Sequence, residues 1–181
     1  MTSPIIFTVA LFVHLVSLVV GFGAVVVVDM FGLLWLARRV PLSLVNRVAG
    51  VTQRLIWLGW SGLVVSGLVL ISKKGFVDNL TLIKLFFVAM LGANGLFLHT
   101  IKKRMEALSD DAIMTPDLKR QVGFSSFISQ LGWWGAMLIG FIHNNWQQNI
   151  NWPPHPWYFI IGMAVVFLGI GFLTLPRTSR S

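Results

Sequence analysis

Five long apolar runs dominate the sequence, and charged residues lie almost entirely between them. The runs cover residues 5–36, 55–72, 80–101, 124–143 and 157–175. Each has about 18 residues or more, the length that an α-helix needs to cross a hydrocarbon core. Because the runs are continuous rather than alternating, they predict helices and not barrel strands. We therefore expect an all-α, multi-pass transmembrane bundle with four core helices and a fifth helix at the C-terminus.

Composition supports one membrane domain over the whole chain, residues 1–181. Hydrophobic residues make up 56% of the sequence and charged residues 11%. The short segments between the runs leave no room for a separate soluble domain. The chain has no cysteine, which excludes disulfides, thiolate metal sites and CxxC redox chemistry.

The net charge of +8 is distributed as in a membrane protein, so we expect a lipid bilayer and not nucleic acid as the partner. Only Lys73 and Lys74 lie on one side of the predicted membrane. The basic residues on the other side are Arg38, Arg39, Arg47, Arg54, Lys102, Lys103, Arg104, Lys119, Arg120, Arg177 and Arg180. The positive-inside rule then places the N-terminus outside and the C-terminus in the cytoplasm.

Four ionisable residues interrupt the apolar runs. His14 and Asp29 lie in the first run, and Lys84 and His99 lie in the third, each pair fifteen residues apart. Ionisable groups at membrane depth cost several kcal/mol, so they usually have a function or a fixed partner. These positions are therefore the first candidates for a functional site.

Helical geometry gives two ways to group these side chains. At 100° per residue, His14 shares a glycine-bearing face with Asp29, and Lys84 shares one with His99. Such faces usually contact a neighbouring helix. One register of the first and third helices would pair His14 with Lys84 and Asp29 with His99, in two levels about 22 Å apart. Depth counted from the helix ends instead places a different set at one level, where it would form a structural polar network: Asp29, Asn94 and Gln130.

Several chemistries suit these residues. A buried imidazole is a common axial ligand of haem, so His14 is a candidate, with His143 as a second ligand. A copper path would combine histidine with methionines of the spans. A proton or substrate relay would use His14, Lys84 and Asp29 directly. The same three residues would also form a purely structural network that holds the helices together.

Two adjacent tryptophans fall near the middle of the fourth run. Trp133 and Trp134 are too deep for the aromatic belt that marks a membrane interface. Packing against small residues is the simpler interpretation, and stacking on a flat cofactor is the alternative.

Two segments resemble known families of small bacterial membrane bundles. They are His14-Leu-Val-Ser-Leu-Val-Val-Gly-Phe-Gly23 and Lys84-Leu-Phe-Phe-Val-Ala-Met-Leu-Gly-Ala-Asn94. A first-helix histidine followed by glycine, and a lysine that opens an apolar helix ending near asparagine, resemble the copper-resistance protein D group. The membrane-bound, non-flavin protoporphyrinogen oxidases are similar in the same places, and there the lysine is followed by a histidine, as by His99 here. After the first-helix histidine those oxidases carry basic and aromatic residues that this chain lacks.

The resemblance implies a four-helix core with a haem or metal site at His14 and Lys84. We expect a protein of the bacterial cytoplasmic membrane that binds haem b, with His14 as the metal ligand. His99 and His143 complete the expected cofactor-binding set, in which Lys84 would face a propionate or transfer protons. The alternatives are a permease for copper or another small solute and a non-catalytic subunit of a larger membrane complex or homo-oligomer.

Overall fold

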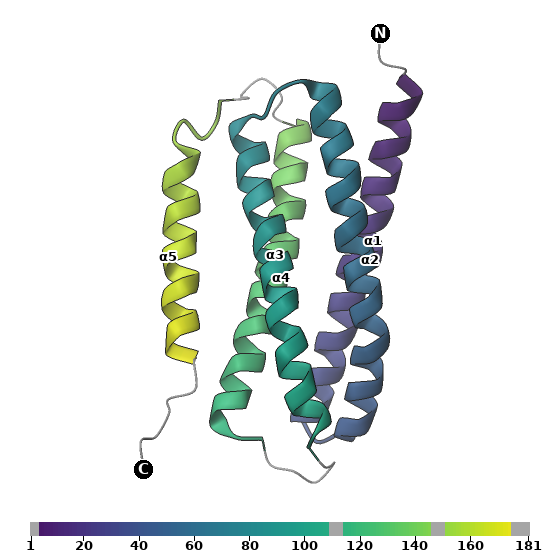
Figure 1. Ribbon diagram of the computed structural model, residues 1–181, viewed down its shortest axis with the longest axis vertical. Coiled ribbons are helices and arrows are strands. Elements are labelled where there is room, and N and C mark those ends of the chain that lie inside the picture. Colours follow the sequence, from purple (N-terminus) through teal and green to yellow (C-terminus); the bar gives the residue numbers. More distant parts are fainter. Residues whose placement is uncertain (1–3, 109–113, 146–150, 175–181) are drawn as a thin grey trace.

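The computed structural model describes residues 4–108, 114–145 and 151–174, and these residues form five helices (Figure 1). The all-α fold predicted from the sequence is confirmed. The helices are α1 (Pro4–Leu36), α2 (Leu42–Lys74), α3 (Asn79–Glu106), α4 (Pro116–Asn145) and α5 (Pro156–Thr174).

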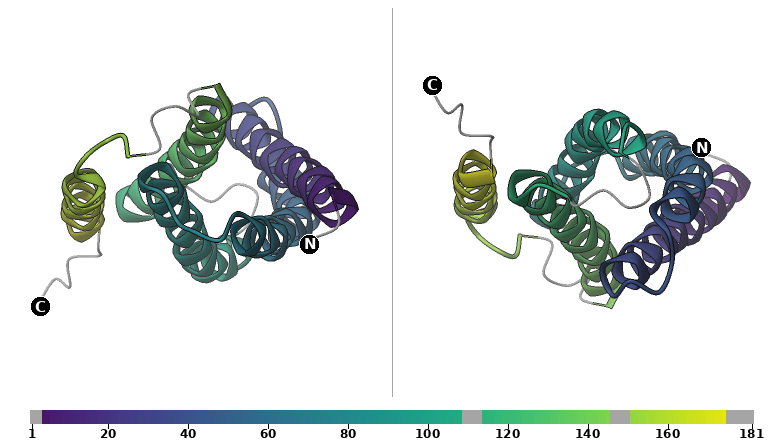
Figure 2. Two further views of the ribbon diagram at one scale, coloured as in Figure 1. Left: turned by 90° about the horizontal axis from the view of Figure 1, so that it is seen from above. Right: turned by 90° about the horizontal axis from the view of Figure 1, so that it is seen from below.

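Helices α1 to α4 stand at the corners of a four-sided bundle, in chain order around it (Figure 2). Helix α1 packs mainly on α2, and α3 packs mainly on α4, while α1 and α3 lie on a diagonal. Helix α5 stands outside the four and contacts α3 and α4. We call the end where α1 and α3 begin the upper end, and the end where they finish the lower end, as in Figure 1.

Local sequence signals explain where the helices begin and end. Helix α2 stops at Gly75, whose φ of 79° is a left-handed conformation that glycine adopts without strain. Asp78 caps α3, because its carboxylate accepts a hydrogen bond of 2.7 Å from the backbone N–H of Thr81. Pro116 and Pro156 open α4 and α5, at the position where the missing N–H has no cost.

Helix α2 begins thirteen residues before the apolar run that predicted it. Arg47 and Arg54, which we expected in a connection, therefore lie on its lower part. Helices α3 and α4 also extend beyond their apolar runs at the lower end. Hydropathy marks only the part of a helix that suits lipid, whereas backbone hydrogen bonding continues into polar sequence until a proline or turn stops it. Arg177, Arg180 and the predicted last residue of the fifth helix, 175, lie outside the described residues.

Among the described residues, three helices, α1, α2 and α3, are long and apolar enough to cross a membrane, whereas we expected five spans. Helix α4 does not meet this criterion, because serine, glutamine, glycine and tryptophan residues lower the mean hydropathy of its apolar stretch. The described part of α5 is a shorter apolar helix, Pro156–Phe172. Large apolar side chains on the outside of the bundle, such as Leu168 and Phe172, suit a lipid environment.

A layer of apolar side chains fills the middle of the bundle. Its buried members come from four helices and are Val25, Leu63, Leu91 and Trp133. We call this set the central apolar layer. The Trp133 indole is only 1% exposed and lies directly against Gly21, where an added Cβ would overlap the ring. Packing against a small residue, the simpler of the two interpretations for Trp133, is therefore confirmed, whereas Trp134 points outward and is 54% exposed.

Small residues bring α1 and α2 into close contact. A Cβ added at Gly59 would lie 2.5 Å from the Gly21 Cα and 2.7 Å from the Ser17 carbonyl oxygen. The glycine-bearing face of α1 therefore contacts α2, and not α3 as the parallel register of the first and third helices suggests. Close approach of backbones at glycine is typical of helix pairs in membranes, where side-chain packing replaces the hydrophobic driving force.

Candidate functional site

His14 and Lys84 meet in the upper half of the bundle. The Lys84 Nζ lies 3.1 Å from the His14 Nε2, although their helices are diagonal to each other. The long lysine side chain spans the distance, and His14 itself is only 9% exposed. The predicted contact between His14 and Lys84 is therefore present in the structure.

Ser66 of α2 holds the other side of the His14 ring. The Ser66 hydroxyl lies 2.5 Å from the Gly62 carbonyl oxygen, to which it donates, and 2.9 Å from the His14 Nδ1. Because the hydroxyl proton is directed to Gly62, the Nδ1–H of His14 donates to the Ser66 oxygen. The Nε2 lone pair then remains to accept a hydrogen bond from Lys84. This chain of bonds fixes both the tautomer and the orientation of the imidazole.

Glycines of α2 and α4 lie beside the two side chains. A Cβ added at Gly67 would lie 3.6 Å from the His14 Cε1, and one added at Gly140 would lie 3.5 Å from the Lys84 Nζ. The pair is thus enclosed by α2 on one side and α4 on the other. Four helices contribute to this site, which explains why sequence periodicity of single helices locates only its two ionisable members.

A second polar group closes the upper end of the bundle. Lys74 forms an ion pair with Asp78, and its Nζ lies 3.0 Å from the His143 Nε2, which is 3.2 Å from the Asp78 carboxylate. Burial raises the pKa of Asp78, but hydrogen bonds from Lys74 and Thr81 outweigh it and hold this pKa below its ordinary value. We call Lys74, Asp78 and His143 the upper cluster.

His143 belongs to this cluster and does not contact His14. Lys84 contacts His14 and is near enough to His143 for their charges to interact. Of the upper cluster, sequence analysis singled out only His143. Lys74 and Asp78 resemble ordinary loop residues in the sequence, and only the approach of the ends of α2, α3 and α4 brings them to the site. Ser66 had a signal, since it is a polar residue between glycines in an apolar run.

Asp29 and Asn94 form polar contacts in the lower half of the bundle. Gln130 donates a hydrogen bond of 2.6 Å to the Asp29 carboxyl, and Asn94 donates bonds of 2.9 Å to the Ser129 hydroxyl and to the Ser125 carbonyl. Asp29 thus contacts α4, as depth counting favours, and the predicted Asp29–His99 level does not form. Helix α4 borders α1, whereas α3 is across the diagonal. Asn94 contacts α4 as well, but in a group separate from Asp29.

His99 lies far below the His14–Lys84 pair, at the lower end of α3. Its Nδ1 is 3.5 Å from the Gln53 Nε2, and its side chain is exposed to a surface pocket between α2 and α3. The structure therefore does not bring His99 into one site with His14, His143 and Lys84.

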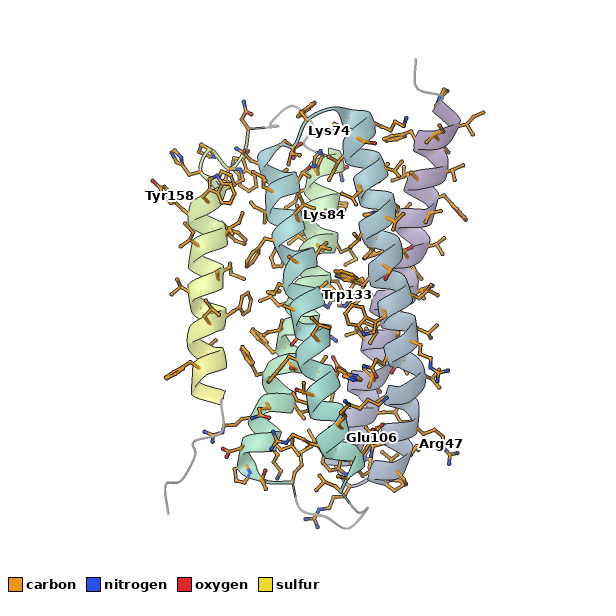
Figure 3. All side chains as sticks on the ribbon, in the orientation of Figure 1. Arg47, Lys74, Lys84, Glu106, Trp133 and Tyr158 are labelled. Carbon is orange, nitrogen blue, oxygen red and sulfur yellow. The ribbon has the colours of Figure 1, made fainter. Side chains whose placement is uncertain are left out.

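The polar groups lie in order along the bundle, as the labelled side chains in Figure 3 show. Lys74 is at the upper end, Lys84 is below it, Trp133 occupies the middle, and Glu106 and Arg47 are at the lower end. The central apolar layer therefore separates the upper cluster and the His14–Lys84 pair from the polar contacts of the lower half.

The arrangement around His14 fits a hydrogen bond better than a metal. A metal bonded to the Nε2 would lie about 2 Å from it, on the side where Lys84 now places its Nζ at 3.1 Å. Haem ligation by His14 therefore does not fit this arrangement unless Lys84 moves away. In the part of the chain that the structure describes, no three His, Cys, Asp or Glu side chains are grouped as metal ligands. Met90 and Met163 pack against the buried apolar cluster of Ile83, Phe87 and Ala136 instead.

Comparisons with known proteins add no family to this picture. Neither the models of protein families, nor curated proteins, nor solved structures show a match to the chain.

Proposed function

We propose that this membrane protein is a proton transporter, in which Lys84 and His14 bind and release each proton that crosses the membrane. The observation that carries the proposal is the contact of 3.1 Å between the Lys84 Nζ and the His14 Nε2. Ionisable residues that pair inside a bundle are typical of proton pathways. We place the protein in a bacterial cytoplasmic membrane, with its upper end outside, on the distribution of basic residues.

The His14–Lys84 pair suits proton exchange because its two nitrogens favour binding one shared proton. Two positive charges at this separation in an apolar interior would repel strongly, so one proton between the two nitrogens is the favourable state. A shift of this proton from the Lys84 Nζ to the His14 Nε2 requires no movement of the backbone. Ser66 supports the exchange by keeping the ring orientation constant.

The upper cluster gives the pair access to one side of the membrane. Lys74, Asp78 and His143 alternate donors and acceptors at the upper end of the bundle, and Lys84 lies within electrostatic range of His143. The central apolar layer blocks the continuation toward the lower half. This combination favours a gated transporter, in which the layer opens during a cycle, over a continuously open channel.

Proton flux in proteoliposomes tests the proposal. The purified protein is reconstituted with a pH-sensitive dye inside, and a potassium diffusion potential created with valinomycin drives protons inward. We expect acidification above that of protein-free liposomes, at least a tenfold decrease in Lys84→Met, and a similar decrease in His14→Asn. Asparagine retains a hydrogen-bond donor for Ser66 but does not titrate.

Lys73→Met is the matched control, because it removes a neighbouring basic residue that lies outside the site. We expect its flux to equal that of the wild type. Equal flux in all variants, or no flux above empty liposomes, would contradict proton exchange. If Lys84→Met changed the thermal stability and nothing else, the pair would have the structural role of a non-catalytic subunit.

A tetrapyrrole protein is the second candidate, and the orientation of His14 by Ser66 favours it. An imidazole whose Nδ1–H is fixed by a hydrogen bond has its Nε2 ready for a metal, once Lys84 has moved from His14 to an anionic partner. A visible spectrum of the purified protein, oxidised and then reduced with dithionite, tests this directly. A Soret band that His14→Asn abolishes would support haem b, and its absence in protein made with ample haem would contradict it.

A further inference from the structure

A pocket of about 780 Å³ opens at the lower end of the bundle, between α2 and α3. It is remote from the His14–Lys84 pair and separated from it by the central apolar layer. The residues that line it are Arg47, Gly50, Val51, Gln53, Arg54, Trp57, His99 and Lys102. The proposed proton exchange uses none of them.

The spacing of the lining residues shows that the pocket lies between one face of α2 and one face of α3. Arg47, Gly50 and Arg54 recur at intervals of three and four residues, so they share one face of α2. His99 and Lys102 are three residues apart on α3 and face the same space. Basic side chains from two helices therefore line one open pocket.

Two further residues determine the shape of the pocket. Gly50 leaves space beside Lys102, since a Cβ added there would lie 3.9 Å from the Lys102 Nζ. The Trp57 indole packs against Gly95, where an added Cβ would lie 3.1 Å from the ring, and it closes the pocket toward the middle of the bundle. The pocket thus has a cationic mouth and an aromatic end.

The charge of the pocket is unbalanced. Arg47, Arg54 and Lys102 are cationic, and none of the lining residues is acidic. The nearest carboxylate on α3, Glu106, contacts Lys102 at 3.5 Å from the following helical turn and is half exposed. Gln53 orients the group by accepting a hydrogen bond of 3.0 Å from the Lys102 Nζ.

We propose that this pocket binds a phosphate-bearing anion, with the phosphate between Arg47, Arg54 and Lys102 and an apolar portion against Trp57. Two guanidinium groups and one ammonium provide charge-assisted donors for phosphate oxygens. The anion is either the headgroup of a phospholipid in the surrounding bilayer or a soluble phosphate compound. Both share the recognition chemistry, and the experiment distinguishes them.

Native mass spectrometry of the full-length protein in detergent tests the lipid source. The protein is titrated with dioleoyl phosphatidylglycerol and, separately, with zwitterionic dioleoyl phosphatidylcholine. We expect a preference of at least tenfold for phosphatidylglycerol, and loss of about ten- to hundredfold in affinity in the double variant Arg47→Gln/Arg54→Gln. Calorimetric titration of inorganic phosphate into protein in phosphatidylcholine nanodiscs tests the soluble source.

Two further variants separate a pocket from diffuse surface charge. Arg39→Gln/Lys103→Gln removes two charges from the same end of the bundle, outside the pocket, and should change the affinity less than threefold. Gly50→Met retains every charge but fills the space beside Lys102, and should weaken binding about as much as Arg47→Gln/Arg54→Gln.

Each outcome decides the proposal. Selective binding of phosphatidylglycerol with this pattern of variants supports a lipid headgroup, and saturable phosphate binding with the same pattern supports a soluble ligand. Binding of neither probe, or equal losses in the control and pocket variants, would overturn the proposal and leave only nonspecific attraction to a basic surface.

Discussion

Replacing Gly59 with alanine should separate α1 from α2 at their closest contact. The added Cβ would lie 2.5 Å from the Gly21 Cα, 2.6 Å from the Gly21 nitrogen and 2.7 Å from the Ser17 carbonyl oxygen. Favourable contacts between such atoms begin at about 3.5 Å. All three atoms belong to the backbone, so no side-chain rotation relieves the overlap, and α1 has to move by about 1 Å.

Two opposing effects determine how much Gly59→Ala changes the free energy of unfolding. Overpacking of this kind costs about 1–3 kcal/mol, and a backbone obstacle places Gly59→Ala at the higher end of this range. The greater helix propensity of alanine offsets about 1 kcal/mol of it. The net loss in the free energy of unfolding should therefore be about 2 kcal/mol. Gly23→Ala is the control, because nothing lies within 4 Å of its added Cβ, and it should be neutral or slightly stabilising.

Reversible unfolding measures this difference. The protein in dodecylmaltoside is titrated with sodium dodecyl sulfate, and the loss of helix is followed by far-ultraviolet circular dichroism. A shift of the Gly59→Ala midpoint to lower detergent fraction, with no such shift in Gly23→Ala, is the expected result. Equal midpoints for the two variants would refute the close α1–α2 contact and the reasoning built on it.

Three further perturbations test other parts of the bundle. Trp133→Ala should cost about 3–5 kcal/mol in the same unfolding assay, whereas Trp134→Ala, at a position 54% exposed, should cost far less; equal effects would contradict the central apolar layer. Asn94→Ala should cost about 1–3 kcal/mol, because two buried acceptors on α4 lose their donor; an unchanged midpoint would contradict these bonds. Because its pKa is lower in the folded state, Asp78 stabilises the fold above its ordinary pKa of 3.8, and this contribution disappears as the pH falls through the folded pKa. The midpoint of the wild type should therefore fall more steeply below pH 4 than that of Asp78→Asn, and parallel profiles would exclude the ion pair with Lys74.

The sequence was sufficient for the helical class and for the identity of the buried ionisable pair. Continuous apolar runs specify helices at membrane depth, because no other short element satisfies its own backbone hydrogen bonds there. For the same reason His14 and Lys84 were recognisable without a structure, since ionisable residues are rare in such runs. Five apolar runs were evident, and within the described residues α1, α2 and α3 satisfy the criterion for a membrane span.

The contacts of the polar residues were harder to predict from the sequence than the helices on which they lie. Asp29 matches either His99 or Gln130 by helical geometry alone, and only the order of helices around the bundle selects Gln130. That order follows from the close contacts of glycines between neighbouring helices, such as Gly59 with Gly21, which the periodicity of a single helix does not encode.

The sequence by itself determined the membrane class, the helices and the two ionisable residues of the site, because hydropathy and helix-ending signals act locally along the chain. The tertiary structure decided what these residues contact. It placed Lys84 across a diagonal onto His14, added Lys74 and Asp78 from the ends of two helices, and directed His99 into a separate pocket. These outcomes depend on which helix faces pack together, and that choice is made by the shapes of all four helices at once.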